Sequence, residues 1–429
     1  MHTADWHFGK TLEGRERITE QRQFIEELCT ICEQEGIDLV LVAGDVFQTV
    51  NPSAQAEELF FMALSSLSAG GTRGVVVIAG NHDHPERIKA AQPMADRLGI
   101  SLVGYPKDTL YPSRIDNEHV DRVAAGTGWV ELIIPGCIEH VVVAAVPYPS
   151  EARLNEVMSE IFDDKEFQTN YNARLAEHFR QLATHFRSDT VNIVMSHLYA
   201  GGGIETDSEV QIQIGGAYAV DKDVFPLTAQ YVALGHLHRS QAVHGTAMPI
   251  RYAGSPLAYS FSEAGQQKSV VVIDVLPGKP AVCKEVPLLS GKPLVKWNAT
   301  QGIEQVIQWV NEGRDADAWI DLAVYVQTGL QLEEIHRLRN IHAGIVHIRP
   351  ILPEQATLRD AQESSDFAAL SMAEVFSRFF VEKQGVKPDG ALVDLFLEMA
   401  TGIEDQMDQL PVDVREFEEV GEQPQIRYK

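Results

Sequence analysis

The sequence predicts an α/β protein in which a large first domain is followed by a small α+β unit and by C-terminal helices. Strand and helix patterns alternate through the first half of the chain, which is typical of a parallel sheet with helices on its faces. Prolines and glycines cluster near residues 277–293 and indicate a linker, and the pattern changes after it. The chain has 429 residues, 45% of them hydrophobic, which is enough for two or three domains with buried cores.

The first half contains the clearest helix and strand patterns. Apolar residues recur on one helical face over residues 18–35, and a second helix is expected over residues 53–68. Apolar runs at residues 38–43 and 75–79 predict buried strands, and each run is followed by glycine and polar residues. The polar stretch 151–187 is expected to form surface helices. Further strands are expected at residues 141–146, 191–195, 231–234 and 269–275.

The chain beyond the linker has a different organisation. Its residues 293–350 are expected to form strand, helix, strand, helix and strand, and residues 320–326 alternate as in a half-buried strand. Helical patterns return after residue 371, and the end of the chain is acidic. The predicted boundaries are 1–280 for the first domain, 288–352 for the α+β unit, 366–405 for the C-terminal helices and 406–429 for the acidic tail.

The composition excludes several classes of protein. With 35 Lys and Arg against 61 Asp and Glu, the net charge is −26, which argues against a protein that wraps nucleic acid on a broad basic surface of its own. The longest apolar runs fall far short of the ~20 residues of a membrane-spanning helix, and no secretory signal is visible, so we expect a cytoplasmic protein. Four cysteines are too few for a disulfide scaffold. Cys29 and Cys32 lie in a predicted helix and are expected to pack rather than to form a redox pair.

Five short segments concentrate Asp, His and Asn, and four of them follow an expected strand. Because the carboxyl ends of adjacent parallel strands converge on one crevice, we expect their side chains to meet there. Asp5 and His7, like His236 and His238, are two residues apart, so in extended backbone both members of each pair point to the same side. Buried structural histidines and turn-forming residues would explain any one segment but not all five in this order. The candidate site residues are Asp5, His7, Asp45, Asn81, His82, Asp83, His197, His236 and His238.

These residue types suit a pair of divalent metal ions. Carboxylate, amide and imidazole ligands favour Mn, Fe or Zn, and no cysteine lies in the five segments, which excludes a thiolate zinc site there. Two ions ~3.5–4 Å apart would activate a water and clamp the attacking and leaving oxygens of a phosphoryl group. Asp45 is the expected bridging carboxylate. His82 is expected to stay unliganded and to assist the leaving group, with Asp83 beside it as the residue that orients it.

The series D-x-H, G-D, G-N-H-D, H and G-H-x-H resembles the signature of the calcineurin-like metallophosphoesterases. More narrowly, the chain resembles the bacterial nuclease subunits of the SbcD family, which partner SbcC-type ATPases. This narrower resemblance is strong over residues 1–275, fainter over the α+β unit and moderate over the C-terminal helices. It rests on residues 2–9, 42–47, 79–83, 214–218, 233–239 and 252–263.

The resemblance implies a two-layered β-sheet core flanked by helices, a capping domain that helps to admit DNA, and C-terminal helices that dock on the coiled-coil root of SbcC. It also implies two ions, typically manganese, and cleavage of DNA phosphodiester bonds from ends and internally. His82 would be the catalytic histidine. One ion would be held by Asp5, His7, Asp45 and His238, and the other by Asp45, Asn81, His197 and His236.

An aromatic and aliphatic stripe runs along the predicted C-terminal helices. It could pack between those two helices, or it could present an amphipathic face to a groove of a partner. The family resemblance favours the partner site. The stripe consists of Phe376, Phe379, Phe380, Leu392, Leu395 and Phe396.

Two other functions remain open on the sequence. A different phosphoesterase could use the same metal centre, although phosphatases of this fold usually carry arginines beside the metal motifs and residues 46–51 contain none. A non-enzymatic relative would have lost ligands, whereas this chain retains every candidate ligand. Two departures from the family pattern also stand out. Met1 directly precedes His2, so we expect a short first strand or a start upstream, and Gln48 replaces a common Asp, with only a local effect expected.

Overall fold

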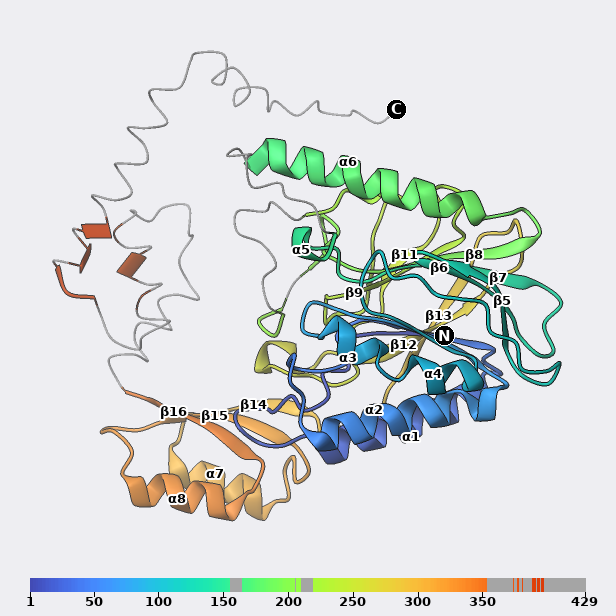
Figure 1. Cartoon of the computed structure of the whole chain (residues 1–429). Helices are drawn as coiled ribbons and strands as arrows, with labels where there is room; N and C mark the ends of the chain where they lie inside the picture. Colours follow the sequence, from blue (N-terminus) through green and yellow to red (C-terminus); the bar gives the residue numbers. More distant parts are fainter. Residues whose placement is uncertain are drawn as a thin grey trace, which may run out of the picture. The chain divides into compact units, whose positions relative to one another are not determined.

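The computed structural model describes residues 1–154, 164–204, 206–209, 219–352 and scattered positions between 373 and 396. Its described strands form a six-stranded, a seven-stranded and a three-stranded sheet (Figure 1). The first sheet contains β1 His2–Thr3, β2 Leu39–Ala43, β3 Gly74–Ile78, β4 Ile100–Val103, β12 Ser269–Asp274 and β13 Val282–Pro287. The second contains β5 Asp121–Gly126, β6 Trp129–Ile133, β7 His140–Val146, β8 Thr190–His197, β9 Tyr231–Gly235, β10 Gln241–Ala242 and β11 Ile250–Tyr252. The third contains β14 Leu294–Ala299, β15 Trp319–Tyr325 and β16 Ile345–Ile351.

The helices between these strands differ widely in length. The α-helices are α1 Ile18–Gln34, α2 Ala54–Leu67, α3 Pro85–Lys89, α4 Gln92–Ala95, α5 Glu151–Leu154, α6 Asp164–Leu182, α7 Ile303–Asn311 and α8 Leu332–Ile341. Short 3₁₀ helices are η1 Ala69–Gly71, η2 Asp96–Leu98, η3 Ala183–His185, η4 Lys222–Val224 and η5 Phe261–Glu263. Helix α2 begins where the Ser53 side chain accepts a hydrogen bond from the Ala56 N–H, which satisfies a backbone donor of its first turn.

The strand order explains which strand ends come together. In the first sheet the order is β13-β12-β1-β2-β3-β4, with β1 to β4 parallel and with β12 and β13 antiparallel to their neighbours. In the second sheet the order is β10-β11-β9-β8-β7-β6-β5, and β7, β8, β9 and β11 run parallel. The parallel pairing expected for the first half is therefore present in each sheet, but antiparallel strands complete both.

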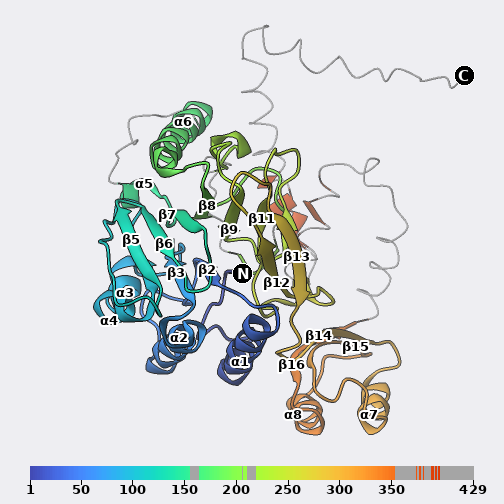
Figure 2. The same ribbon diagram turned by 90° about the vertical axis from the view of Figure 1, so that its right-hand side faces the viewer.

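The two large sheets pack face to face, with helices on their outer faces (Figure 2). One core lies between the first sheet and helices α1 and α2 and includes Phe24 and Phe60. A second core lies between the sheets and includes Leu41 and Val143. A third lies between the second sheet and α6 and includes Phe179. This layering explains why β2 and β3 are apolar throughout, since both of their faces are buried.

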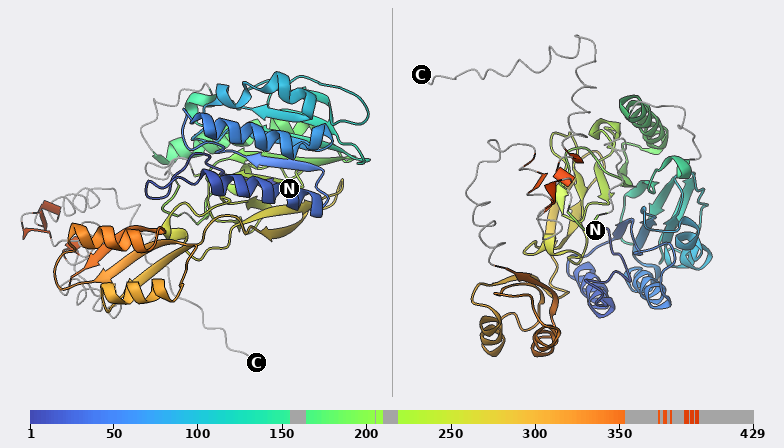
Figure 3. Two further views of the ribbon diagram at one scale, coloured as in Figure 1. Left: turned by 90° about the horizontal axis from the view of Figure 1, so that it is seen from below. Right: turned by 90° about the vertical axis from the view of Figure 1, so that its left-hand side faces the viewer.

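The three-stranded sheet carries α7 and α8 on one face (Figure 3). The order of its elements matches the expected alternation of strand and helix over residues 293–350. Its residues Leu294 and Val346 pack against Leu12 of the loop after β1. The Trp319 indole N–H also donates to Glu20 Oε1 of α1 at 3.0 Å. The small sheet is thus joined to the first domain beside the loop that follows β1.

Several expectations concern residues outside the described part of the chain. These residues are 214–218, most of 366–405, all of the tail 406–429, and Phe379. The expected helix at 18–35 and strands at 38–43 and 75–79 are present to within about a residue, whereas β4, β5, β6, β10, β11 and β13 were not expected. The first strand has two residues, and the Met1 amino group donates to the Leu39 carbonyl at 2.7 Å. Among the described helices, none is long and apolar enough to cross a membrane.

Candidate metal centre

The residues predicted to bind metal follow strands that are neighbours within each large sheet. In the first sheet, Asp5 follows β1, Asp45 follows β2 and residues 81–83 follow β3. In the second sheet, His197 is the last residue of β8 and His236 comes directly after β9. The parallel strands of each sheet bring these ends to one edge, and the face-to-face packing of the sheets brings the two edges together.

Four of these residues have left-handed backbone conformations. The φ angle is 55° at Asp5, 46° at His7, 51° at Asp45 and 104° at His236. Residues other than glycine rarely adopt such angles, and each residue that does so costs on the order of 1–3 kcal/mol of stability. Four such residues at one edge of the sheets indicate that the fold holds their side chains in place despite the cost of a strained backbone.

Glycines precede the ligand segments because no side chain would fit there. A Cβ at Gly80 would lie 2.1 Å from Asp45 Oδ1, and a Cβ at Gly235 would lie 1.9 Å from the Ala43 carbonyl oxygen. Any larger residue would push the loops after β2, β3 and β9 apart. The glycines of the G-N-H-D and G-H-x-H segments therefore permit the close approach of the ligand loops.

Asp45 lies between the two halves of the cluster. Its Oδ2 atom lies 3.6 Å from His7 Nε2 and 3.5 Å from His197 Nε2. Asn81 Oδ1 lies 2.9 Å from the same His197 nitrogen, and the His236 ring packs edge-on against His197. Three groups have ligand atoms within 4.8 Å of one another: Asp5, His7 and His238; His7, Asp45 and His82; Asp5, Asp45 and His197.

The donor set fits divalent cations. His7 Nε2 and His238 Nε2 face each other at 3.0 Å, and both rings are buried. Two imidazole nitrogens can share at most one proton at that distance, and a cation held by both would use both lone pairs. His7 Nδ1 is also buried without a hydrogen-bond partner among the described residues. Carboxylate oxygen and neutral imidazole together suit ions such as Mn²⁺, Fe²⁺ or Zn²⁺.

Backbone carbonyls fix the tautomers of two histidines. His197 Nδ1 lies 2.9 Å from the Ala43 carbonyl oxygen, and His82 Nδ1 lies 2.8 Å from the Gln48 carbonyl oxygen. A carbonyl can only accept, so Nδ1 carries the proton in both rings. The Nε2 atom of His197 is thereby left as a ligand, and that of His82 is left free for proton transfer.

The structure differs from the expectation that Asp83 orients His82. Asp83 is fully buried, and its carboxylate accepts from the backbone N–H groups of Val46, Phe47 and Gly80 at 3.1, 2.9 and 2.8 Å. Those bonds join the loop after β2 to the loop after β3. The residue that orients the His82 ring is Gln48, through its backbone carbonyl.

Burial keeps most of the ligand imidazoles neutral. It lowers the pKa of His236 to about 3 and lowers the pKa values of His7 and His238 well below the usual range for histidine. Burial also raises the pKa of Asp5 well above its usual value. A metal ion binds the deprotonated form of each of these groups, so the three histidines are already in the form that a ligand needs.

Asp45 and His197 behave as a charge pair. Burial disfavours both charged forms, but their mutual attraction outweighs it, raising the pKa of His197 to about 9 and lowering the pKa of Asp45 well below its usual value. Burial and the neighbouring Asp45 charge raise the pKa of Asp83 to about 6. A divalent cation at this point would take the place of the proton on His197 and would supply the positive charge that stabilises the Asp45 carboxylate.

Sequence reasoning missed the residues that hold His238. Ser208 Oγ lies 2.5 Å from His238 Nδ1, and Glu209 Oε1 accepts from the His238 backbone N–H at 2.7 Å. The Lys10 ammonium donates to the Ser208 carbonyl at 3.0 Å. Ser208 and Glu209 lie in the loop that begins with glycines 201–203, whose composition gives no sign of a contact with the metal segments. Only a local Ser and Glu pair in that loop could have drawn attention to it.

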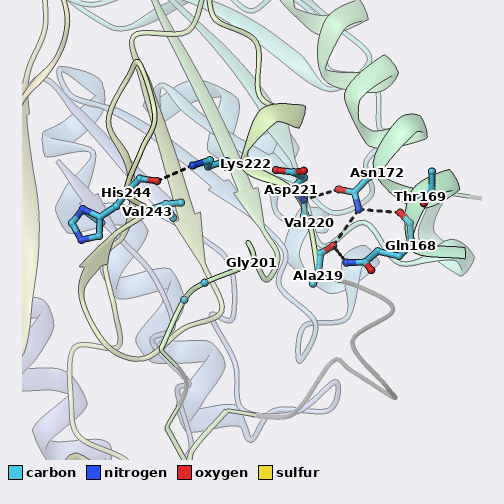
Figure 4. A pocket seen from close by; sticks show the side chains of 13 residues that line it. Gln168, Thr169, Asn172, Gly201, Ala219, Val220, Asp221, Lys222, Val243 and His244 are labelled. Carbon is cyan, nitrogen blue, oxygen red and sulfur yellow. Dashed lines mark hydrogen bonds between the residues drawn. The ribbon is translucent and has the colours of Figure 1, made fainter. Parts of the chain in front are cut away.

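The glycines of that loop line a separate polar pocket of about 670 Å³ (Figure 4). Gln168 and Asn172 of α6 point toward the Ala219 carbonyl, and Asp221 and Lys222 follow on the same wall. Its polar side chains already bond to protein groups, since Asn172 also accepts from the Asp221 N–H at 2.6 Å. None of the predicted site residues is among the described residues that line this pocket.

Comparison with known proteins identifies the family. A family model described as calcineurin-like phosphoesterase matches residues 1–240, and one described as type 5 capsule protein repressor C-terminal domain matches residues 290–384. The chain is 48% identical over 408 residues to the SbcD subunit of the nuclease SbcCD of Bacillus subtilis, covering 95% of this chain and 98% of that protein.

Two proteins of the same name in other bacteria are also similar. The one from Rhodobacter capsulatus is 34% identical and covers 69% of this chain and 70% of its own length. The one from Staphylococcus epidermidis is 32% identical and covers 72% of this chain and 74% of its own length. Together with the strand-end cluster around Asp45, these similarities show that the chain belongs to the SbcD family of calcineurin-like phosphoesterases.

Proposed function

We propose that the chain is a metal-dependent DNA nuclease that hydrolyses phosphodiester bonds in the cytoplasm, in DNA repair, recombination and replication. Its activities would be 3′–5′ exonuclease action on double strands and endonuclease action on single strands and hairpins. The observation that carries the proposal is the buried cluster in which Asp45 lies 3.5–3.6 Å from histidines of both sheets. The B. subtilis, R. capsulatus and S. epidermidis relatives are named as nuclease subunits, which supports DNA as the substrate.

Two divalent ions would be the cofactors, and the family resemblance favours manganese. The contacts support two ligand sets that share Asp45, because its ligand atoms group with that of His7 and also with that of His197. Bound there, the ions would neutralise charge on the phosphoryl group and lower the pKa of a water. The proposed sets are Asp5, His7, Asp45 and His238 for one ion and Asp45, Asn81, His197 and His236 for the other.

His82 is the proposed catalytic histidine. Its ring packs edge-on against His7 at a centroid distance of 4.9 Å, and its Nδ1 proton is held by the Gln48 carbonyl. When the ring carries a proton on both nitrogens, the Nε2 proton is therefore the one that can pass to the departing oxygen of the cleaved bond. Asp83 supports this residue indirectly, since its three backbone hydrogen bonds fix the loop on which His82 lies.

An SbcC-type ATPase is the proposed partner, in a complex with two copies of each protein and with this chain as a homodimer. The relatives' name, which describes one subunit of the nuclease SbcCD, supports a second subunit. Among the described C-terminal positions, Phe376 stacks on Phe396 at 4.1 Å and lies 6.0 Å from Phe380, and Leu395 is about half exposed. Phe376, Phe380 and Phe396 thus form one aromatic cluster, which we propose docks on the partner.

A substrate panel tests the proposed function. The purified chain is incubated with Mn²⁺ and hairpin-ended duplex DNA, bis-nitrophenyl phosphate or a phosphoserine peptide. The proposal predicts cleavage of the first two and none of the peptide. Hydrolysis of the peptide but not of DNA would instead support a phosphatase, and no hydrolysis of any substrate would support a non-enzymatic relative.

A further inference from the structure

Arg153 binds the loop that carries Asn81 and His82, although it belongs to a different sheet layer. It lies in the short helix α5, which follows β7 of the second sheet, whereas Asn81 and His82 follow β3 of the first. Its Nη1 donates to the Gly80 carbonyl at 2.6 Å, and its Nη2 donates to the Asp83 carbonyl at 2.7 Å. The two carbonyls lie on either side of Asn81 and His82, so one guanidinium group spans the whole segment.

The same loop is held from its other side by Asp83. That carboxylate accepts from the Gly80 N–H, while Arg153 binds the Gly80 carbonyl, so both polar groups of this residue's backbone are fixed. The His82 backbone N–H donates to Asp45 Oδ1 at 2.9 Å, which joins the loop to the carboxylate at the centre of the cluster. A shift of the loop would therefore move Asn81, His82 and the contact to Asp45 together.

Arg153 also reaches His197 indirectly, through the ring of Tyr148. The Arg153 guanidinium lies over the Tyr148 ring, 5.3 Å from its centroid, and the Tyr148 ring packs edge-on against His197 at 6.5 Å. The Tyr148 N–H donates to the Ala79 carbonyl at 2.9 Å, directly before Gly80. Arg153 and Tyr148 thus lie between the two elements that supply Asn81 and His197, whose side chains meet at 2.9 Å.

We propose that Arg153 is a positioning residue for the metal centre, which sets the distance between the Asn81–His82 loop and His197 by binding the carbonyls of Gly80 and Asp83. The proposal rests on the proposed function of the site. A planar guanidinium suits this task because its two terminal nitrogens diverge at a fixed angle, whereas a lysine ammonium is a single point donor. The side chain is half-buried, and each of its two terminal nitrogens donates to one of these carbonyls.

The test compares Arg153→Ala and Arg153→Lys with wild type and with Arg180→Ala, which removes an exposed arginine of α6 that pairs with Glu177. Titration calorimetry measures Mn²⁺ binding, and steady-state kinetics measure kcat and KM on hairpin DNA. For Arg153→Ala we expect one of two Mn²⁺ affinities to fall at least about tenfold and kcat to fall about 10²-fold, with little change in KM. Ethylguanidinium added to Arg153→Ala should restore part of the Mn²⁺ affinity and part of kcat. The Mn²⁺ affinity and kcat of Arg153→Lys should stay close to those of Arg153→Ala.

Each result decides the proposal. Unchanged Mn²⁺ affinities and kcat with a raised KM would show that Arg153 contacts DNA instead and would overturn it. Full activity of Arg153→Lys would also overturn the proposal, because two diverging donor nitrogens would then be unnecessary. If Arg153→Ala does not fold, the Mn²⁺ affinities of Arg153→Lys decide whether the guanidinium is needed, because they should be weaker than those of wild type. If wild type and Arg180→Ala bind Mn²⁺ but cleave no DNA, the proposed function fails, while the calorimetry still tests Arg153.

Discussion

Asp45 and His197 come from different sheets, yet Asp45 Oδ2 lies 3.5 Å from His197 Nε2. Asp45 follows β2 of the first sheet and His197 ends β8 of the second, so this contact depends on the packing of the two sheets. The same carboxylate oxygen lies 3.6 Å from His7 Nε2. One side chain thus connects both groups of ligands, and its removal affects both.

Replacement of Asp45 is therefore expected to abolish metal binding at one or both sites. Asp45→Ala removes the shared carboxylate and leaves the buried His7 and His197 without their anionic partner. Metal content per chain, measured by mass spectrometry after dialysis, should fall by at least one ion. Asp189→Ala, at an exposed position, is the control and should keep the wild-type content. Wild-type content in Asp45→Ala would contradict the shared role.

Replacement of His82 is expected to separate catalysis from metal binding. His82→Ala removes the Nε2 proton donor but no member of the two proposed ligand sets, so metal content should be unchanged. Cleavage of hairpin DNA should fall about 10²–10⁴-fold, the usual contribution of a positioned acid. His84→Ala, an exposed neighbour, should cleave normally. Cleavage by His82→Ala at the wild-type rate would show that another group serves the leaving oxygen.

Loss of the Ser208 hydroxyl is expected to weaken metal binding through His238. Ser208 Oγ is the partner of His238 Nδ1, and such partners fix the ring that binds the ion. Ser208→Ala should lower the affinity for Mn²⁺ about 10–100-fold by calorimetry, and Ser208→Thr should retain most of it. Ser188→Ala, on the exposed surface, is the matched control. Equal affinities in Ser208→Ala and in the control would show that the ring is held by other contacts.

The Glu131–Arg187 pair is expected to make stability depend on pH. The Arg187 hydrogen bond lowers the pKa of Glu131 to about 2, so its stabilising effect is complete above the unfolded pKa of about 4.3 and is lost as the pH falls toward 2. Since the Arg187 side chain is 44% exposed, solvent screening limits the effect at neutral pH to about 1 kcal/mol.

Glu131→Gln tests this pair, with Glu58→Gln at an exposed position as the control. Urea unfolding should give a lower free energy of unfolding for Glu131→Gln than for wild type at about pH 7, and the difference should shrink toward about pH 3. A difference that stays constant with pH would mean that the lost stability comes from packing and not from the charge of Glu131.

The sequence predicted the site better than the sheets around it. Polar segments at the ends of apolar strands were sufficient to group Asp45, Asn81, His197 and His236, because parallel strands must bring their carboxyl ends together. The residues that hold the ligands were not predictable in the same way. Gln48 acts through a backbone carbonyl, and Arg153 reaches a loop some 70 residues away, so neither leaves a pattern of spacing.

Antiparallel strands at the edges of the two large sheets were also missed, for a physical reason. β5 and β13 have mostly half-exposed or exposed residues, so they lack the continuous apolar run that revealed β2 and β3. The parallel strands β4 and β11 have only four and three residues, and the polar Ser101 and Arg251 interrupt their apolar runs. Their place in the sheets depends on pairing with other strands, as β11 does with β9.

The measurement that tests the central claim most directly is cleavage of hairpin-ended duplex DNA by the purified chain. It is made with Mn²⁺, with a chelator, and with an added SbcC-type partner and ATP. We predict cleavage that requires Mn²⁺, stops with the chelator and increases with the partner and ATP. Absence of cleavage under all of these conditions, in protein that binds two ions per chain, would contradict the assignment of this metal centre to a DNA nuclease.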